Sequence, residues 1–282
     1  MPHPASSDSQ WLQTLIRSLD ATEVSPLGET LPRFPSIQMQ ENTTGLSAEA
    51  ALHKAYAFYS DVDRELQAIG RPLTPDTRVL DFGFGWGRIS RTFMEKVSIR
   101  NLYGIDVDPV FAEMTRSLFD SEQFQACAAF PPVSFDDASF DLVISYSVFS
   151  HLSERACADW MREFARIVRP GGVVAWTTRH DSFFGFCEWA RAQGDSASSY
   201  IQALGALFPD IDDARRRYAA GEIVHASSLG VSGGGPRDSS FYGETWIPEA
   251  YARTAYAEHF DLVATCFDGS KYDQACFVFQ RK

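Results

Sequence analysis

The segment that decides the fold is VLDFGFGWG, residues 79–87. An apolar run typical of a buried strand leads directly into three alternate glycines, and a helical pattern follows. Glycine lets the backbone turn tightly and approach a ligand closely, because no Cβ stands in the way. The segment therefore predicts a strand, a tight loop and a helix, with a nucleotide-like ligand bound at the carboxyl end of the strand.

The residues after this segment continue the alternation of strand and helix. Strands that read as apolar runs separated by helices are typical of a parallel sheet covered on both faces. Two closely spaced strands near the C-terminus suit an antiparallel hairpin. The sequence predicts a doubly wound, Rossmann-like α/β fold with a mainly parallel, seven-stranded sheet and an antiparallel last strand. The predicted strands are 78–82, 102–106, 123–129, 140–146, 173–178, 261–267 and 274–280, and the predicted helices are 87–97, 109–119, 154–168 and 248–258.

Further patterns divide the chain into four parts. Apolar residues at helical spacing predict helices at 10–19 and 47–68, and prolines at positions 26, 32 and 35 predict an irregular linker between them. The predicted parts are an N-terminal arm and linker (1–45), a cofactor-binding core (46–180), a helical insertion (181–245) and a C-terminal helix and hairpin that complete the sheet (246–282).

The insertion interrupts the regular alternation for about 65 residues. A run of small residues, SSLGVSGGG at 227–235, predicts a flexible stretch within it. Its aromatic residues suit a lid over a substrate, because long functional loops often cover active sites. A helical subdomain or a homodimer interface would use the same residues, which are Phe183, Phe184, Phe186, Trp189, Tyr200 and Tyr218.

Composition excludes several classes of protein. The chain has 282 residues, of which 45% are hydrophobic, so it is long enough to bury a full core. Its formal net charge of −12 leaves no general basic footprint for a nucleic acid. No apolar run is long enough to cross a membrane, and the first ten residues lack the features of a signal peptide. We therefore expect a cytoplasmic protein that binds neither nucleic acid nor membrane.

The cysteines indicate neither a disulfide framework nor a zinc site. Five are spread along the chain with no CxxC pair, and free cysteine packs as a small hydrophobe. We therefore interpret them as buried thiols. No His, Asp or Glu cluster has the spacing of metal ligands, so the sequence predicts no metal.

A nicotinamide dinucleotide enzyme is the first alternative for the glycine loop. Its GxGxxG fingerprint would use Gly83 and Gly85 and would need a small residue at the next glycine position, which is Arg88 here. Asp81, at the end of the strand, would also repel a pyrophosphate, whereas it suits a ligand with a positive charge. Both residues disfavour this alternative.

The loop and three further motifs in order resemble the class I S-adenosylmethionine-dependent methyltransferases. The other motifs are LYGID at 102–106, DDASFDLVIS at 136–145 and the VRPGG turn at 168–172, so that the resemblance covers about residues 46–180. It implies S-adenosylmethionine as the cofactor, with Asp106 accepting hydrogen bonds from the ribose hydroxyls. It implies that the cofactor-binding residues are Asp81, Phe82, Gly83, Phe84, Gly85, Gly87, Asp106, Val107, Phe130 and Ser145.

One position departs from the family pattern. Many relatives carry an acidic residue after the third strand that receives the adenine amino group, but the residues here are Ala128, Ala129 and Phe130. We therefore expect adenine to stack on Phe130 and to contact the backbone. The chain also lacks the Asn/Asp-Pro-Pro-Tyr signature of relatives that methylate amino groups of nucleic acid bases or glutamine.

The acceptor side of the site is predicted around the ends of the fourth and fifth strands. His151 lies where some small-molecule and sugar O-methyltransferases of the family have a histidine, and it suits a general base. A structural histidine of the following loop is the alternative. Tyr146, Arg179 and His180 are the predicted substrate-binding residues, although a loop arginine can also be merely solvated.

The predicted function is methyl transfer from S-adenosylmethionine to an oxygen of a small molecule, such as a glycan unit or a natural product. Transfer to the nitrogen of a small molecule or peptide amine is the alternative. More distant alternatives are an NAD-dependent oxidoreductase and a non-catalytic cofactor-binding protein. The expected partner is the small-molecule acceptor, with a homodimer also compatible with the sequence.

Overall fold

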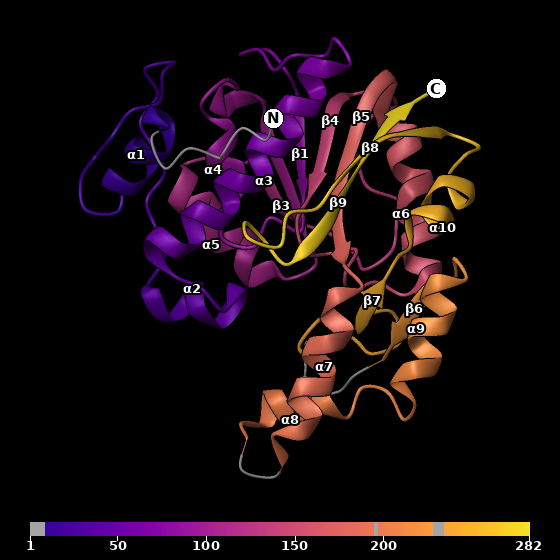
Figure 1. The fold of residues 1–282 in the computed structure, drawn as a ribbon. Helices are drawn as coiled ribbons and strands as arrows, with labels where there is room; N and C mark the ends of the chain where they lie inside the picture. Colours follow the sequence, from indigo (N-terminus) through magenta and orange to yellow (C-terminus); the bar gives the residue numbers. More distant parts are fainter. Residues whose placement is uncertain (1–8, 195–196, 228–233) are drawn as a thin grey trace. The chain divides into compact units, whose positions relative to one another are not determined.

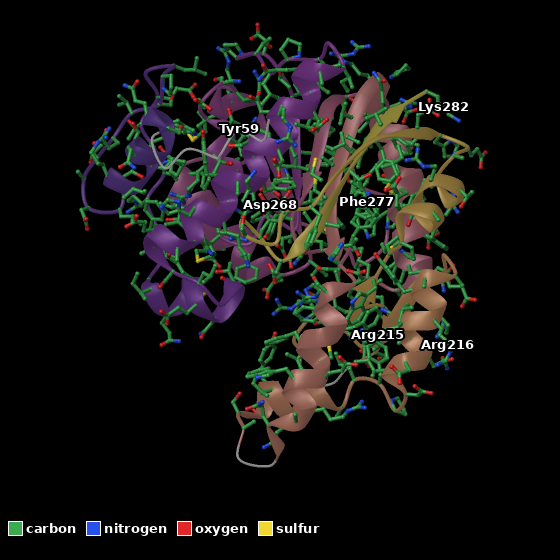
Figure 2. The ribbon with its side chains drawn as sticks, viewed as in Figure 1. Tyr59, Arg215, Arg216, Asp268, Phe277 and Lys282 are labelled. Carbon is green, nitrogen blue, oxygen red and sulfur yellow. The ribbon has the colours of Figure 1, made fainter. Side chains whose placement is uncertain are left out.

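The computed structural model describes residues 9–194, 197–227 and 234–282, and the chain folds into two compact units. The first unit contains residues 1–127 and 138–146, and the second contains residues 128–137 and 147–282. Figure 1 shows the helices and strands of both, and Figure 2 adds the side chains of the described residues. Most of the run at 227–235 that was predicted to be flexible, and the first eight residues, lie outside the described residues.

The sheet of the first unit consists of four parallel strands in the order β3-β2-β1-β4. Because they are parallel, their carboxyl ends meet at one edge, where Asp81 pairs with Gly104 and Asp106 with Ala126. Helix α5 (Pro109–Phe119) packs on β2 and β3. The strands are β1 (Val79–Phe82), β2 (Leu102–Asp106), β3 (Phe124–Ala126) and β4 (Phe140–Ser145).

The N-terminal residues add helices to this unit. Helices α1 (Gln10–Arg17) and α3 (Ala48–Ala68) agree with the prediction. Helix α2 (Ile37–Thr44) does not, because that segment was predicted to be irregular. The helix forms after Pro35, where the Ser36 hydroxyl accepts a hydrogen bond from the Met39 N–H and Gly45 ends the helix at a φ of 68°.

The helix after the glycine loop is much shorter than the predicted 87–97. Helix α4 covers only Ser90–Phe93, and a short 3₁₀ helix, η1 (Ile99–Asn101), precedes β2. The chain from 85 to 89 instead forms turns, with the Gly87 N–H donating to the Phe84 carbonyl at 2.8 Å. A glycine at positive φ at position 87 cannot continue a right-handed helix.

The second unit contains the antiparallel end of the fold. Strand β9 (Gln274–Arg281) pairs antiparallel with β5 (Val168–Arg179) and with β8 (Phe260–Cys266), which confirms the predicted hairpin and antiparallel last strand. Helix α6 (Glu154–Ile167) packs on β5, and α10 (Glu249–Ala255) packs on β8. The predicted turn at 168–172 lies inside β5, where Gly171 has a φ of 73°.

The insertion contains two strands that the sequence did not predict. It folds into α7 (Ser182–Ala192), α8 (Ser199–Gly205), α9 (Ile211–Ala219), β6 (Val224–Ala226) and β7 (Glu244–Trp246). Strand β7 pairs in parallel with the end of β5 and antiparallel with β6. The described residues therefore contain nine strands rather than seven. The short strands escaped prediction because three residues carry no visible period.

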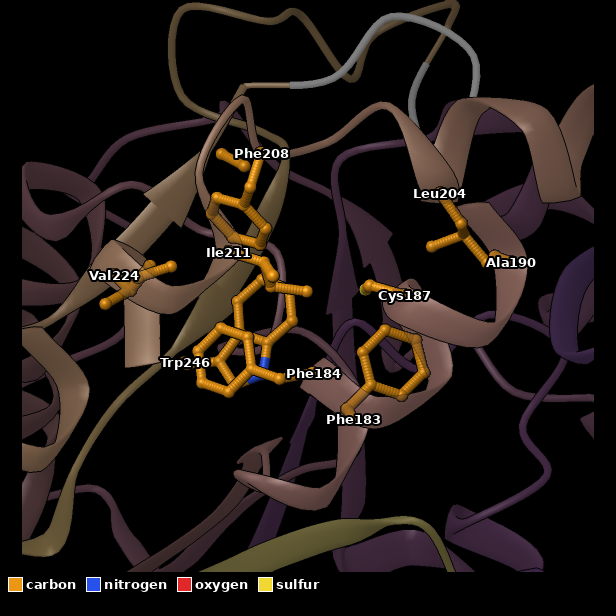
Figure 3. Packing of buried hydrophobic residues seen from close by; sticks show 11 residues of the cluster. Phe183, Phe184, Cys187, Ala190, Leu204, Phe208, Ile211, Val224 and Trp246 are labelled. Carbon is orange, nitrogen blue, oxygen red and sulfur yellow. The ribbon is translucent and has the colours of Figure 1, made fainter. Parts of the chain in front are cut away.

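The insertion has a hydrophobic core of its own (Figure 3). The ring of Phe184 stacks on Trp246 at a centroid distance of 4.8 Å, and Phe183 packs beside them. Trp189 and Tyr200, by contrast, are exposed. The aromatic residues thus divide into a buried group that stabilises a helical subdomain and an exposed group, and a role as a lid or interface stays a prediction.

Two further observations concern the whole chain. Among the described residues, no helix is both long and apolar enough to span a membrane. All five cysteines are free thiols, and four are buried as predicted, whereas Cys127 is only partly buried.

Candidate functional site

The glycine loop after β1 is held by hydrogen bonds from two neighbouring elements. The Gly83 N–H donates to the Ile105 carbonyl at 2.8 Å, and the Gly85 N–H donates to Oδ2 of Asp106 at 3.0 Å. The Thr115 hydroxyl, on α5, donates to the Gly85 carbonyl at 2.9 Å. Strand β2 and helix α5 therefore fix the loop on both sides.

Glycine is favoured at positions 83, 85 and 87 of this loop, but for different structural reasons. Gly83, Gly85 and Gly87 all have positive φ, which side chains with a Cβ rarely adopt. A Cβ on Gly87 would lie 2.3 Å from the ring of Phe119, so α5 packs directly on this glycine. A Cβ on Gly85 would meet nothing within 4 Å. The open space at Gly85 leaves room for a ligand to approach the backbone, as a nucleotide cofactor requires.

Asp106 organises the edge of the sheet beside the loop. One carboxylate oxygen accepts from the Gly85 N–H, and the other accepts from the Asp108 N–H at 2.9 Å. Asp108 in turn caps α5 by accepting from the Val110 N–H at 3.0 Å. Val107, between the two acids, is half-buried. A carboxylate fixed at this position suits the recognition of paired hydroxyl groups.

Asp81 lies deeper than the sequence suggested. Its side chain is buried, and its Oδ2 accepts from the Ser90 hydroxyl at 2.6 Å. Burial raises the pKa of Asp81 to about 7, with the nearby Asp106 carboxylate adding to the rise and the Ser90 hydrogen bond opposing it. Asp81 thus titrates near neutral pH.

The other predicted residues of the first unit are buried around the strand ends. Phe82 accepts, through its carbonyl, a hydrogen bond from the Ser145 hydroxyl at 3.0 Å. The ring of Phe84 packs edge-on against Phe124 at 5.2 Å. The ring of Tyr146 contacts Phe58 and the guanidinium of Arg88, which lies 4.9 Å from the ring centroid. Tyr146 is therefore mostly buried, and its role in substrate binding stays a prediction.

His151, in the second unit, is buried against β7 and the residues just before it. Its Nδ1 lies 2.8 Å from the Gly243 carbonyl oxygen and 3.2 Å from Oε1 of Glu244. The ring of Tyr242 stacks on the imidazole at 5.0 Å with an interplanar angle of 9°. The imidazole is thus held on its face by Tyr242 and at Nδ1 by the carbonyl and carboxylate oxygens.

Glu244 connects His151 to Arg179. The carboxylate is completely buried, and its Oε2 accepts from Nε of Arg179 at 2.9 Å and lies 2.8 Å from Nη2. The guanidinium carbon lies 4.1 Å from the centroid of the Phe183 ring. Burial alone would lower the pKa of Arg179, but the charge and hydrogen bond of Glu244 raise it. Arg179 is therefore a buried partner of a carboxylate and not a solvated loop residue.

Sequence reasoning identified His151 and Arg179 but missed Glu244. The three residues form one cluster, although 65 positions separate Arg179 from Glu244. The only local signal was the alternation of side chains in the short strand β7, which places Glu244 and Trp246 on the same face.

Two residues of the second unit that were predicted to bind the acceptor or the cofactor, His180 and Phe130, pack against other side chains of the protein. His180 stacks on Phe267 at 3.5 Å, its Nδ1 lies 2.8 Å from Oδ1 of Asp181, and partial burial lowers its pKa. Phe130 packs against Phe241 at 5.7 Å and under the guanidinium of Arg155. Their predicted contacts with the acceptor and the adenine stay predictions.

The segment that contains the glycine loop matches a known protein family. Residues 79–172 match the model of a methyltransferase domain. This segment of the chain belongs to the methyltransferase domain family. The match contains the glycine loop, Asp106, β4 and the first residues of β5, and it confirms the resemblance predicted from the ordered motifs.

Curated relatives match a similar part of the chain. The 2-methyl-6-phytyl-1,4-hydroquinone methyltransferase of Synechocystis sp. is 32% identical over 114 residues, which are 39% of this chain and 35% of that protein. The sarcosine/dimethylglycine N-methyltransferase of Halorhodospira halochloris is 30% identical over 117 residues, which are 40% of this chain and 41% of that protein. The methyltransferase domain thus aligns with about a third to two fifths of the length of these relatives.

A solved structure extends the likeness in fold to most of the chain. The 1,6-didemethyltoxoflavin-N1-methyltransferase of Burkholderia thailandensis, bound to 1,6-didemethyltoxoflavin and S-adenosylhomocysteine, has a TM-score of 0.50 at 14% identity. The match covers 87% of this chain and 84% of that one. It confirms the Rossmann-like fold predicted from the sequence.

Proposed function

We propose that this chain is an S-adenosylmethionine-dependent methyltransferase that methylates an oxygen of a small molecule, such as a glycan unit or a natural product. The observation that carries the proposal is the loop at 83–87, open at Gly85 and tied to the buried carboxylate of Asp106, within a segment that matches a methyltransferase domain.

The residues of the first unit fit this cofactor. S-adenosylmethionine supplies an electrophilic methyl group on a sulfonium when it is bound, so the task of the protein is mainly to position the reactants. Asp106 would hold the ribose hydroxyls, and the backbone at Gly85 would approach the ligand without obstruction. We assign stacking on adenine to Phe130, as expected from the sequence.

His151 is the proposed base for the acceptor. A hydroxyl is a poor nucleophile until its proton begins to leave, and a positioned base contributes about a hundred- to ten-thousand-fold. A nitrogen acceptor is the second candidate, favoured by the similarity to an N-methyltransferase of sarcosine and dimethylglycine. A neutral amine already has a lone pair for the attack, so it would need no base.

Calorimetry tests the cofactor proposal. The protein should bind S-adenosylmethionine and not NAD. Asp106→Ala should weaken this binding by about 1.5–3 kcal/mol, which is roughly ten- to a hundred-fold, because the lost hydrogen bonds involve a charged group. Asp76→Ala is the control, since Asp76 is exposed. Equal affinities of all three proteins would show that Asp106 does not hold the cofactor.

A panel of phenols, sugars and hydroxy acids, each with a matched amine, tests the acceptor proposal. Release of S-adenosylhomocysteine reports turnover, and mass spectrometry with NMR of the product shows which atom carries the methyl group. His151→Ala should lower kcat on a hydroxyl acceptor by about a hundred- to ten-thousand-fold with cofactor affinity unchanged. Methylation of amines alone would favour the second candidate, and binding without any turnover would favour a non-catalytic protein.

A further inference from the structure

We infer that Glu244, held by Arg179, is a positioning residue that keeps the proton of neutral His151 on Nδ1 and so leaves Nε2 as the proton acceptor. The inference rests on the proposed function, because it explains how the proposed base is prepared. It also gives Arg179 a role other than binding an anionic substrate.

The backbone of the second unit brings Glu244 to His151. The Gly243 N–H donates to the His151 carbonyl at 2.7 Å, and the Thr245 N–H donates to the Ser150 carbonyl at 2.8 Å. Leu152 and Tyr242 form an antiparallel bridge beside them. The residues around His151 therefore pair with those around Glu244 as two short antiparallel segments, which fixes the distance between the two side chains.

The surroundings of Nδ1 determine the tautomer of His151. A carbonyl oxygen and a carboxylate oxygen can only accept hydrogen bonds, and both lie within 3.2 Å of this nitrogen. Nδ1 must therefore carry the proton when the imidazole is neutral. Since a neutral imidazole has one proton, Nε2 carries a lone pair, and the Tyr242 ring fixes the plane in which that lone pair points.

Arg179 keeps the carboxylate charged and oriented. A carboxylate without exposure to water is costly unless it is paired, and Arg179 places two donors on Oε2. The other oxygen is then directed at His151. When Nε2 accepts a proton from a hydroxyl acceptor, the imidazolium that forms lies beside a full negative charge, which stabilises it.

Three further polar groups near this cluster are Thr245, His225 and Asp273. The Thr245 hydroxyl donates to the Leu152 carbonyl at 2.7 Å, and it accepts from Nδ1 of His225 at the same distance. Burial lowers the pKa of His225, and the charge of Glu244 opposes this shift. Oδ2 of Asp273 lies 3.8 Å from Nη1 of Arg179, whereas Glu244 contacts Nε and Nη2 of the same guanidinium.

The wild-type protein itself provides the first test. Protein labelled with ¹⁵N in its six histidines gives nitrogen shifts that distinguish a protonated from an unprotonated ring nitrogen, and loss of one set of signals in His151→Gln assigns His151. The expected result, at a pH where the ring is neutral, is a proton on Nδ1 and none on Nε2. A ring protonated at Nε2 would overturn the inference, whatever the acceptor is.

Glu244→Gln supplies the second test. Arg179 has donors only, so it should hold the amide oxygen and turn the amide NH₂ towards Nδ1. A donor facing Nδ1 favours the proton on Nε2, so this variant should show a mixed or reversed tautomer. Glu244→Asp, which keeps the charge, should restore the Nδ1 signal at least in part. Glu249→Gln is the matched control, because Glu249 is a glutamate exposed to solvent, and its spectrum should match wild type.

Kinetics on the hydroxyl compound with the highest turnover in the panel complete the test. Glu244→Gln should lower kcat by at least about tenfold and by no more than His151→Ala does, which is about a hundred- to ten-thousand-fold. KM for S-adenosylmethionine should not change. In the His151→Ala background the same substitution should cost nothing more, because Glu244 acts through His151. A merely structural role would give additive losses, and that outcome would overturn the inference.

The outcomes separate the inference from the proposed function. If His151→Ala leaves kcat on a hydroxyl acceptor unchanged, the proposed base is wrong and the positioning role is wrong with it. If His151→Ala lowers kcat while Glu244→Gln changes neither kcat nor the tautomer, only the positioning role is wrong.

Discussion

Gly85 and Gly87 share a left-handed backbone but differ in what surrounds them. At both positions an alanine would be strained by the positive φ, which destabilises the folded state by about 1–2 kcal/mol. At Gly87 the new Cβ would also overlap the Phe119 ring, and forcing atoms into a packed site costs typically about 1–3 kcal/mol more. Packing therefore requires a glycine at position 87, whereas we expect ligand approach to require the one at position 85.

The matched substitutions Gly85→Ala and Gly87→Ala separate these purposes. Gly87→Ala should lower the free energy of unfolding in urea by clearly more than Gly85→Ala does. Gly85→Ala should instead cause a large loss of affinity for S-adenosylmethionine with only a small loss of stability. The reason is that its methyl group occupies the open space beside the loop. Equal losses of stability in the two variants would contradict this division.

Asp81 makes the stability of the protein depend on pH. Its pKa of about 7 in the folded protein lies above the 3.8 of an ordinary aspartate, so the folded state binds a proton more tightly than the unfolded state does. The stabilisation from this proton is complete below about pH 4 and is lost as the pH rises through about 7.

Asp81→Asn removes this titration while keeping the shape of the side chain. Wild type should lose stability relative to Asp81→Asn as the pH rises from about 4 to about 7, measured by urea unfolding without cofactor. A stability difference that stays constant over this range would mean that the carboxyl group of Asp81 has an ordinary pKa.

At the scale of elements, the sequence predicted the boundaries of helices and strands best where neighbouring residues determine them. Helix α5 begins and ends as predicted, because Asp108 caps it and Pro109 occupies its first turn. Strand β2 likewise matches the prediction residue for residue. Helix α4 was overestimated because the helical pattern continued after Gly87, although turns occupy most of that segment.

Contacts between distant residues explain what the sequence could not predict. His151, Arg179 and Glu244 were each visible as polar residues, but they are joined only by the pairing of β5 with β7 and by the bridge between Leu152 and Tyr242. The pairing places Arg179 opposite Trp246, and nothing local in the sequence specifies it. The cofactor loop, a local motif, was therefore predictable, whereas the cluster around the proposed base was not.

The core of the insertion depends on Trp246. Trp246→Ala should destabilise the protein by about 3–5 kcal/mol, because the indole is fully buried between Phe184, Phe183 and Phe208. Trp189→Ala is the control, since Trp189 is about half exposed, and it should change stability by no more than about 0.5 kcal/mol. Thermal unfolding measures both. A large loss in Trp189→Ala would show that the stacking of its ring on Phe186, at a centroid distance of 5.1 Å, stabilises the fold.

At the scale of the whole molecule, the chain carries a net charge of −12 with its acidic residues widely dispersed. Within the described residues, no group of three or more His, Cys, Asp or Glu side chains has a geometry that could hold a metal ion. Methyl transfer by direct displacement also needs no Lewis acid.

We therefore expect turnover to persist in EDTA. The rate of S-adenosylhomocysteine release should be the same with and without the chelator, and added magnesium should not change it. Loss of turnover in EDTA that magnesium restores would place the protein among metal-dependent methyltransferases.

The ion pair between Arg179 and Glu244 has a consequence for how the insertion can vary. Arg179 is the last residue before the insertion leaves the sheet, and Glu244 is the first residue of the strand that returns to it. The ion pair thus joins the two ends of the intervening chain. Because doubling the length of a flexible closed loop costs only about 0.6 kcal/mol, we expect the chain between the two residues to tolerate added residues that leave the packing on Trp246 intact. Chimeras that exchange residues 185–240 and retain Arg179, Glu244 and the contacts of His151 with Tyr242 and Gly243 would test whether the insertion sets the acceptor preference.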